Sequence, residues 1–248
     1  MSTVALTRPS LNRLTAVELR KMTDTRSGFW LQLAVAALTV LVVVIVALVG
    51  ERPDKTLREM LNVAVQPASI LLPVMGVLLV TSEWTQRTTL QTFTLVPQRS
   101  RVVVAKLGAS VLLSLVAFVI ALVVAVFGTA IASPDVANPW SLPIGLLGQD
   151  VFTLVTGMMG GVAFGAVLLS SAPAIVALFA LPLVTGAIGS IHALEPVAKW
   201  VDPTHTLAPM TDHVMSATEW AHAGVTLAWL LVLPIAVGMW RIARSEVS

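Results

Sequence analysis

The chain has 248 residues, of which 56% are hydrophobic and only 11% are charged, and its mean hydropathy is +0.89. Soluble domains carry about 25% charged residues, so this composition excludes a soluble domain, and it excludes intrinsic disorder as well. The net charge of +2 does not indicate nucleic-acid binding, and the absence of cysteine excludes disulfides and thiolate metal sites. We therefore expect an integral membrane protein.

Six stretches with at most one charged residue are long enough to cross a bilayer, because a hydrocarbon core about 30 Å thick needs about 20 apolar residues as a helix. They predict spans at about residues 29–50, 61–82, 106–131, 143–169, 173–193 and 220–241. The uncharged interval between Asp150 and Glu195 is too long for one span, and Ser170-Ser171-Ala172-Pro173 marks a turn that divides it. The expected fold class is an all-α integral membrane protein with six transmembrane helices.

The basic residues predict the orientation of these spans. Eleven of the fifteen Lys and Arg residues fall on the side that holds both termini, and four fall on the other side. Since basic residues accumulate on the cytoplasmic side, we expect a multi-pass protein with both termini in the cytoplasm.

A short amphipathic helix is expected before the first span, at about residues 11–24. Leu11, Leu14 and Val17 lie on one broad side of its helical wheel, whereas Glu18 and Lys21 intrude into that apolar sector. Such a helix is typical of a segment lying parallel to the membrane surface. A solvated tail is the alternative.

The loop after the second span is unusually polar and is followed by several basic residues. Glu83 and Arg87 stand four residues apart, which favours a short helix at about residues 83–95, and Pro97 ends it. Taken alone, this segment is also compatible with an ordinary positive-inside loop.

The same segment resembles the loop after the second span of ABC-2 type permeases, the membrane subunits of bacterial ATP-binding-cassette exporters. The residues that fit the family pattern are Glu83, Thr88, Leu90, Pro97, Arg99 or Arg101, and Lys106. Glu18-Leu19-Arg20-Lys21 with Thr25-Arg26-Ser27 resembles the family's entry segment. Six spans, cytoplasmic termini and an outer loop with short helices at about residues 194–219 also match, so the resemblance covers the whole chain. Arg87 departs from it, since many relatives have glycine there.

The resemblance implies that residues 83–95 form a coupling helix that docks onto a separate ATPase subunit. The residues that it implies for this contact are Glu83, Trp84, Arg87, Thr88, Leu90 and Phe93. It also implies that ATP and Mg²⁺ bind to the partner chain, that this chain holds no cofactor and is not an enzyme, and that a second copy or a homologous permease completes the transporter. The chain itself has no P-loop.

Several residues inside the spans are candidates for contact with a transported molecule or for packing. The cavity candidates are Gln66, Met75, Asp150, Met158 and Met159. Asp150 is the one ionisable residue well inside a predicted span, and such residues are expensive in the bilayer. Gly157, Gly161 and Gly165 recur at four-residue spacing, which predicts close helix packing.

The expected function is therefore that of a permease subunit of an exporter in a bacterial plasma membrane. It would move amphipathic, lipid-like or drug-like cargo outward by alternating access, with membrane lipid as a further partner and no nucleic acid. Two alternatives remain open. One is an intramembrane metal-dependent enzyme that uses the outer histidines, with His205 and His213 as weak candidates, although no metal site is expected from their spacing. The other is an ion-coupled secondary transporter that uses Asp150.

Overall fold

The computed structural model describes residues 10–51, 55–85, 99–133 and 136–244. All regular secondary structure in these ranges is helical. Six helices are long and apolar enough to cross a membrane. The protein is therefore an all-α integral membrane protein, as the sequence predicts.

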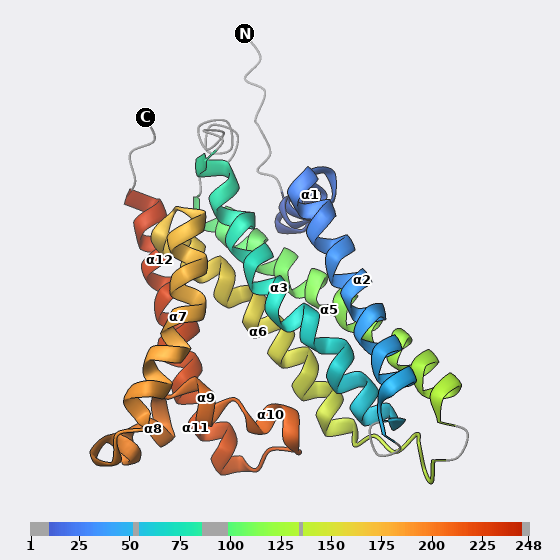
Figure 1. The fold of residues 1–248 in the computed structure, drawn as a ribbon. Coiled ribbons are helices and arrows are strands. Elements are labelled where there is room, and N and C mark those ends of the chain that lie inside the picture. The colour runs from blue at the N-terminus through green and yellow to red at the C-terminus, as the bar shows by residue number, and fades with distance from the viewer. Residues whose placement is uncertain (1–9, 52–54, 86–98, 134–135, 245–248) are drawn as a thin grey trace.

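Figure 1 shows the order of the helices along the chain by colour. The first is α1 (Leu11–Asp24). The helices long enough to span a membrane are α2 (Arg26–Val49), α3 (Leu57–Thr85), α5 (Arg99–Ala132), α6 (Ile144–Leu168), α7 (Ser171–Gly189) and the continuous run of α11 (Ala217–Leu227), η3 (Ala228–Val232) and α12 (Leu233–Arg244). Between α7 and α11 lie η2 (His192–Leu194), α8 (Glu195–Val201), α9 (Pro203–Thr206) and α10 (Pro209–Asp212).

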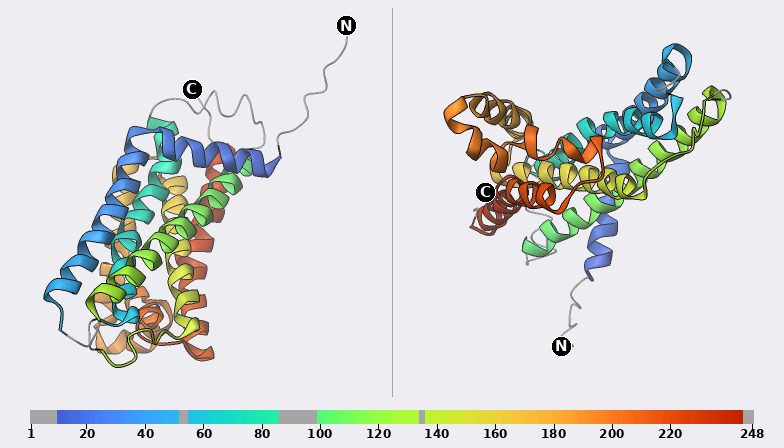
Figure 2. Two further views of the ribbon diagram at one scale, coloured as in Figure 1. Left: turned by 90° about the vertical axis from the view of Figure 1, so that its right-hand side faces the viewer. Right: turned by 90° about the horizontal axis from the view of Figure 1, so that it is seen from below.

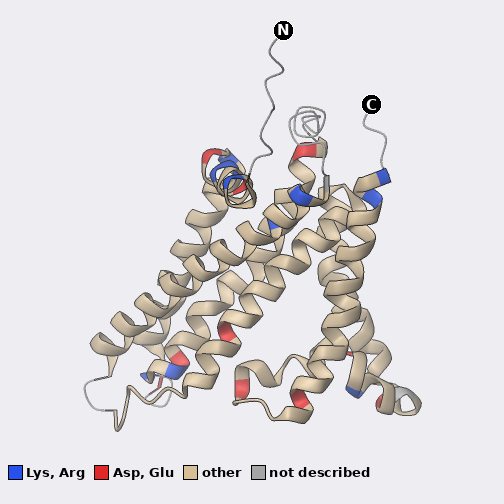
Figure 3. Ribbon diagram, turned by 180° about the vertical axis from the view of Figure 1, so that it is seen from behind, with Lys and Arg blue, Asp and Glu red and all other residues tan. Residues whose placement is uncertain are grey.

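The bundle has two different ends. At one, called here the terminal end, α1 and α12 mark where the two ends of the chain lie (Figure 1). At the opposite, far end, α8 to α10 and the start of α11 gather beneath the long helices (Figures 1 and 2). Charged residues are concentrated at these two ends, and the middle of the bundle carries few (Figure 3).

Helix α3 forms the centre of the bundle. It is the most buried of the six spanning helices, whereas α7 is the least buried. Two glycines let α6 approach it closely: a Cβ on Gly161 would collide with the carbonyl oxygen of Pro73, and one on Gly165 would come 3.0 Å from the carbonyl oxygen of Val77. Backbone contact of this kind is how small residues pack membrane helices.

Most helix boundaries differ from the predicted ones by a few residues, and two of the differences bear on the site. Helix α5 begins at Arg99, so Lys106 lies two turns inside it rather than at its start. Residues 83–85, predicted to begin a separate helix, continue α3, and residues 86–98 lie outside the described ranges. The predicted turn near Ser170 is present, because α6 ends in a left-handed Leu169 (φ 54°) and α7 begins two residues later.

Candidate functional site

Two features of the described residues have the geometry of a functional site. One is a buried cluster of four charges at the terminal end. The other is an apolar cavity among the spanning helices.

The charge cluster joins three helices through two carboxylates and two ammonium groups. Lys106 of α5 donates to Glu18 Oε2 of α1 at 2.6 Å and to Glu83 Oε1 of α3 at 3.0 Å. Lys21 of α1 donates to Glu18 Oε1 at 2.7 Å and to the same Glu83 oxygen at 2.6 Å. Lys106 also donates to the carbonyl oxygen of Leu79 at 2.8 Å, so its three ammonium protons each have an acceptor.

Burial makes these ion pairs different from surface pairs. Glu18, Glu83 and Lys106 are 4%, 8% and 4% exposed, so loss of any one partner would leave a buried charge uncompensated. Lys21 lies nearer the surface. Burial lowers its pKa, but the carboxylates of Glu18 and Glu83 outweigh that effect and hold the pKa above the ordinary lysine value. Lys21 therefore stays protonated throughout the physiological pH range.

The local sequence brings α1 into position for this cluster. Glu18 and Lys21 stand three residues apart and so share one face of α1. On the same side, Thr15 lies against Gly108 of α5, where an added Cβ would come 3.1 Å from the threonine hydroxyl oxygen. Thr25 ends α1 and caps α2 by accepting from the Gly28 N–H at 3.2 Å. The chain thus turns sharply between the surface helix and the first spanning helix (Figure 2, left).

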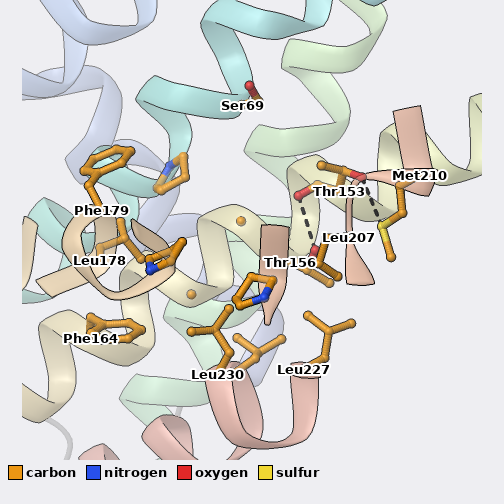
Figure 4. A pocket seen from close by; sticks show the side chains of 16 residues that line it. Ser69, Thr153, Thr156, Phe164, Leu178, Phe179, Leu207, Met210, Leu227 and Leu230 are labelled. Atoms are coloured by element: carbon orange, nitrogen blue, oxygen red, sulfur yellow. Dashed lines mark hydrogen bonds between the residues drawn. The ribbon is translucent and has the colours of Figure 1, made fainter. Parts of the chain in front are cut away.

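The cavity lies among α3, α6, α7 and η3 and has a volume of 280 Å³ (Figure 4). Its walls are mostly aliphatic and aromatic. The residues that line it are Ser69, Pro73, Thr153, Thr156, Gly157, Gly160, Phe164, Leu178, Phe179, Pro182, Pro203, Leu207, Met210, Leu227, Leu230 and Leu231. Several helix irregularities meet there: Pro73 inside α3, Pro182 inside α7 and the π-helical turn η3. Both prolines lie inside continuous helices, and π-turns often mark functional sites.

Two of the predicted coupling residues lie in the described part of the chain, and the other four do not. Glu83 lies in the charge cluster, and the neighbouring Trp84 is half-buried at the end of α3. Arg87, Thr88, Leu90 and Phe93 lie outside the described residues.

The predicted cavity residues do not come together. Gln66 is exposed on α3, whereas Met75 and Met158 are fully buried in the core and Met159 is half-buried. Asp150 lines a small recess at the far end together with Arg58 of α3. None of these five residues lines the 280 Å³ cavity. The helix-packing candidate Gly157 does line it, beside Gly160.

The histidines are separated in the structure. His205 Nε2 lies 3.9 Å from a carboxylate oxygen of Asp202, and His213 Nε2 lies 2.8 Å from Glu219. Within the described ranges, no three His, Asp or Glu side chains gather in a group that could hold a metal ion.

Sequence reasoning missed two groups of contacts. It named Glu18, Lys21 and Lys106 without pairing them, although Glu18 and Lys21 stood out in the apolar sector of the helical wheel. It also passed over Gln149 of α6, which is 3% exposed. The Gln149 amide donates to the carbonyl oxygens of Met210 (2.9 Å) and His213 (2.8 Å) and accepts from the Met215 N–H (2.9 Å).

The chain matches no model of a known protein family and no curated protein sequence. The fold of the described residues defines the class only as an integral membrane protein with six helices long enough to span a membrane.

Proposed function

We propose that the chain is the permease subunit of an ATP-driven exporter of the ABC-2 type in a bacterial plasma membrane. In this proposal the terminal end faces the cytoplasm, in line with its excess of basic residues. A separate ATPase subunit binds ATP and Mg²⁺ and docks on residues 83–95. A second copy or a homologous permease completes the transporter.

The observation that carries the proposal is the buried charge cluster. Glu83 and Lys106 belong to α3 and α5, the two helices that flank residues 86–98, and both pair with Glu18 of α1 directly or through Lys21. A push on the segment between these helices would therefore move α1, α3 and α5 together as one rigid unit. Transmission by rigid elements is how a movement at one site reaches another.

The test begins with purification of the chain from its own host in mild detergent, with mass spectrometry of the proteins that accompany it. We expect a stoichiometric partner with a P-loop. The pair is then reconstituted in liposomes, and ATP hydrolysis is measured with and without the permease.

The decisive variant is Arg87→Glu, because Arg87 belongs to the proposed docking segment, whereas Glu83 takes part in the buried cluster. We expect ATP hydrolysis to fall to the rate of the isolated ATPase, while the permease still inserts and purifies normally. Arg13→Glu makes the same charge change on the exposed face of α1 and is the matched control. The proposal fails if no P-loop partner is found, or if Arg87→Glu behaves like Arg13→Glu.

A further inference from the structure

The cavity among α3, α6, α7 and η3 has the size and chemistry of a binding site. None of the residues that line it is charged. Its volume of 280 Å³ is close to the lower limit of about 300 Å³ for small-molecule pockets. A cavity of this size can hold one hydrocarbon chain or one ring, but not a whole lipid with two acyl chains.

The polar side chains in the wall have no free hydroxyl proton to offer a ligand, so their oxygens act only as acceptors. The hydroxyls of Ser69, Thr153 and Thr156 donate to carbonyl oxygens of their own helices, at Gln66 (2.8 Å), Gln149 (2.9 Å) and Phe152 (2.7 Å). A polar solute would lose its hydration with little replacement, and a water molecule needs two to four polar partners to remain in a cavity. The lining therefore selects an apolar occupant.

The surroundings indicate where such an occupant comes from. Phe179 lines the cavity and is 40% exposed on α7, the least buried of the spanning helices. From this exposure we infer that the cavity opens sideways at Phe179, toward the side of the bundle where α7 lies. The far-end wall contains Met210, whose sulfur lies 3.5 Å from the Thr153 hydroxyl (Figure 4) and whose carbonyl oxygen accepts from the Gln149 amide. The cavity thus has a lateral rim and a far-end wall that includes Met210.

We propose that this cavity binds a single hydrocarbon chain, such as the acyl chain of a one-chain amphiphile, entering sideways from the bilayer past Phe179. The chain lies against Gly157 and Gly160 of α6, whose missing side chains make the space. Binding requires no ATPase. That the bound molecule is also cargo rests on the proposed export function.

The test uses the purified full chain in lipid nanodiscs and a lysophospholipid with a diazirine at the end of its acyl chain. After illumination, mass spectrometry locates the adducts. We expect them on cavity residues such as Phe164, Leu178 and Leu230, and we expect an excess of dodecane, which has no headgroup, to suppress them.

The cavity-filling variant is Gly157→Leu. An added Cβ there meets only Pro73 Cγ, at 3.5 Å, which is ordinary contact, so the leucine side chain extends into the cavity. It displaces at least two methylenes of the chain, and we expect about tenfold weaker labelling of the cavity residues. Gly148→Leu is the matched control, because Gly148 is an exposed glycine of the same helix with nothing within 4 Å of an added Cβ.

A series of substitutions of increasing size distinguishes a filled cavity from a misfolded protein. Gly157→Ala and Gly157→Val should reduce labelling in the order of their volumes, and Leu178→Trp fills the cavity from the opposite wall. Adducts confined to lipid-facing residues such as Ile70 and Leu183, or cavity labelling that Gly157→Leu leaves unchanged, would overturn the proposal. Neither outcome depends on a P-loop partner, so this binding site and the proposed function can fail separately.

Discussion

The two ends of the bundle hold their short helices by different chemistry. At the terminal end, α1 is attached to α3 and α5 by four charges, three of them almost completely buried. At the far end, the chain between α7 and α11 is held mostly by hydrogen bonds to backbone groups. Charged groups also take part: the Arg58 guanidinium donates to the Asp212 carbonyl, and the Glu219 carboxylate accepts from the Ser216 N–H. Gln149 anchors the residues around α10, and Asp202 caps α9 by accepting from the Thr204 N–H at 3.0 Å.

This difference affects how each end of the bundle can move. Separating buried opposite charges costs much free energy. We therefore expect α1, α3 and α5 to move as a unit. A hydrogen bond contributes about 1 kcal/mol between neutral groups and about 1.5–3 kcal/mol where one group is charged, so we expect the far-end segment to detach locally before the bundle unfolds. A rigid terminal end and a releasable far end suit a protein that receives a movement on one side and opens on the other.

The largest effect is expected from Lys106→Met. The substitution leaves the carboxylates of Glu18 and Glu83 buried without the Lys106 ammonium that pairs with both. Breaking a buried pair by removing one partner costs about 3–5 kcal/mol, and we expect the free energy of unfolding to fall by about that amount. Denaturant titration of the purified protein in detergent micelles, followed by circular dichroism, measures it.

Two variants make this test specific. Arg20→Met removes an ion pair whose side chains are 83% and 62% exposed, and it should cost less than about 1 kcal/mol. Adding Glu18→Leu to Lys106→Met removes one charge of each sign and leaves the Lys21–Glu83 pair, so part of the loss should return. Equal effects of Lys106→Met and Arg20→Met would show that the cluster does not hold α1 in place.

The number and type of helices could be predicted from the sequence because they depend on local composition. The charge-poor stretches that are long enough to cross a bilayer locate all six spanning helices. The ends were harder: α5 continues through the basic residues from Arg99 to Lys106, where charge suggested a loop. In the structure Lys106 has buried carboxylate partners, so the charge does not end the helix.

The site was less predictable, because it depends on how distant helices are rotated against one another. Glu18 and Lys106 are 88 residues apart, and the helical wheel of α1 shows only that Glu18 is out of place among apolar residues. Likewise, the four-residue glycine spacing on α6 does not distinguish Gly161, which touches the backbone of α3, from Gly157, which lines the cavity. Both glycines face Pro73 of α3, but an added Cβ on Gly161 would collide with its carbonyl oxygen, whereas one on Gly157 would only touch its ring carbon Cγ at 3.5 Å.

The next largest effect is expected from Gln149→Leu. It removes the partners of the Met210 and His213 carbonyls and of the Met215 N–H in one step, and an unpaired buried polar group costs about 1–3 kcal/mol. We expect a local rather than global loss. Hydrogen–deuterium exchange should show the Met215 amide losing its protection first, while amides of α1 and α3 remain as protected as before.

Gln32→Leu is the matched control, since Gln32 makes one comparable bond, to the Met22 carbonyl at 3.0 Å, at the terminal end. It should leave exchange at residues 207–215 unchanged. If Gln149→Leu instead lowers protection throughout the bundle, the far end is not an independently releasable unit and the contrast between the two ends is wrong.

The smallest effect is expected from Thr226→Val, which tests a single hydroxyl at the far end. Thr226 of α11 is completely buried, shares a 2.8 Å hydrogen bond with the Thr206 hydroxyl and donates to the Trp200 carbonyl at 3.2 Å. Valine keeps the shape but not the hydroxyl, so we expect a loss of about 1 kcal/mol in thermal or denaturant unfolding. Because the single variant leaves Thr206 without this partner, Thr206→Val combined with Thr226→Val should cost less than the sum of the two single changes. An additive double variant would mean that the two hydroxyls do not interact and that α9 is held to α11 by packing alone.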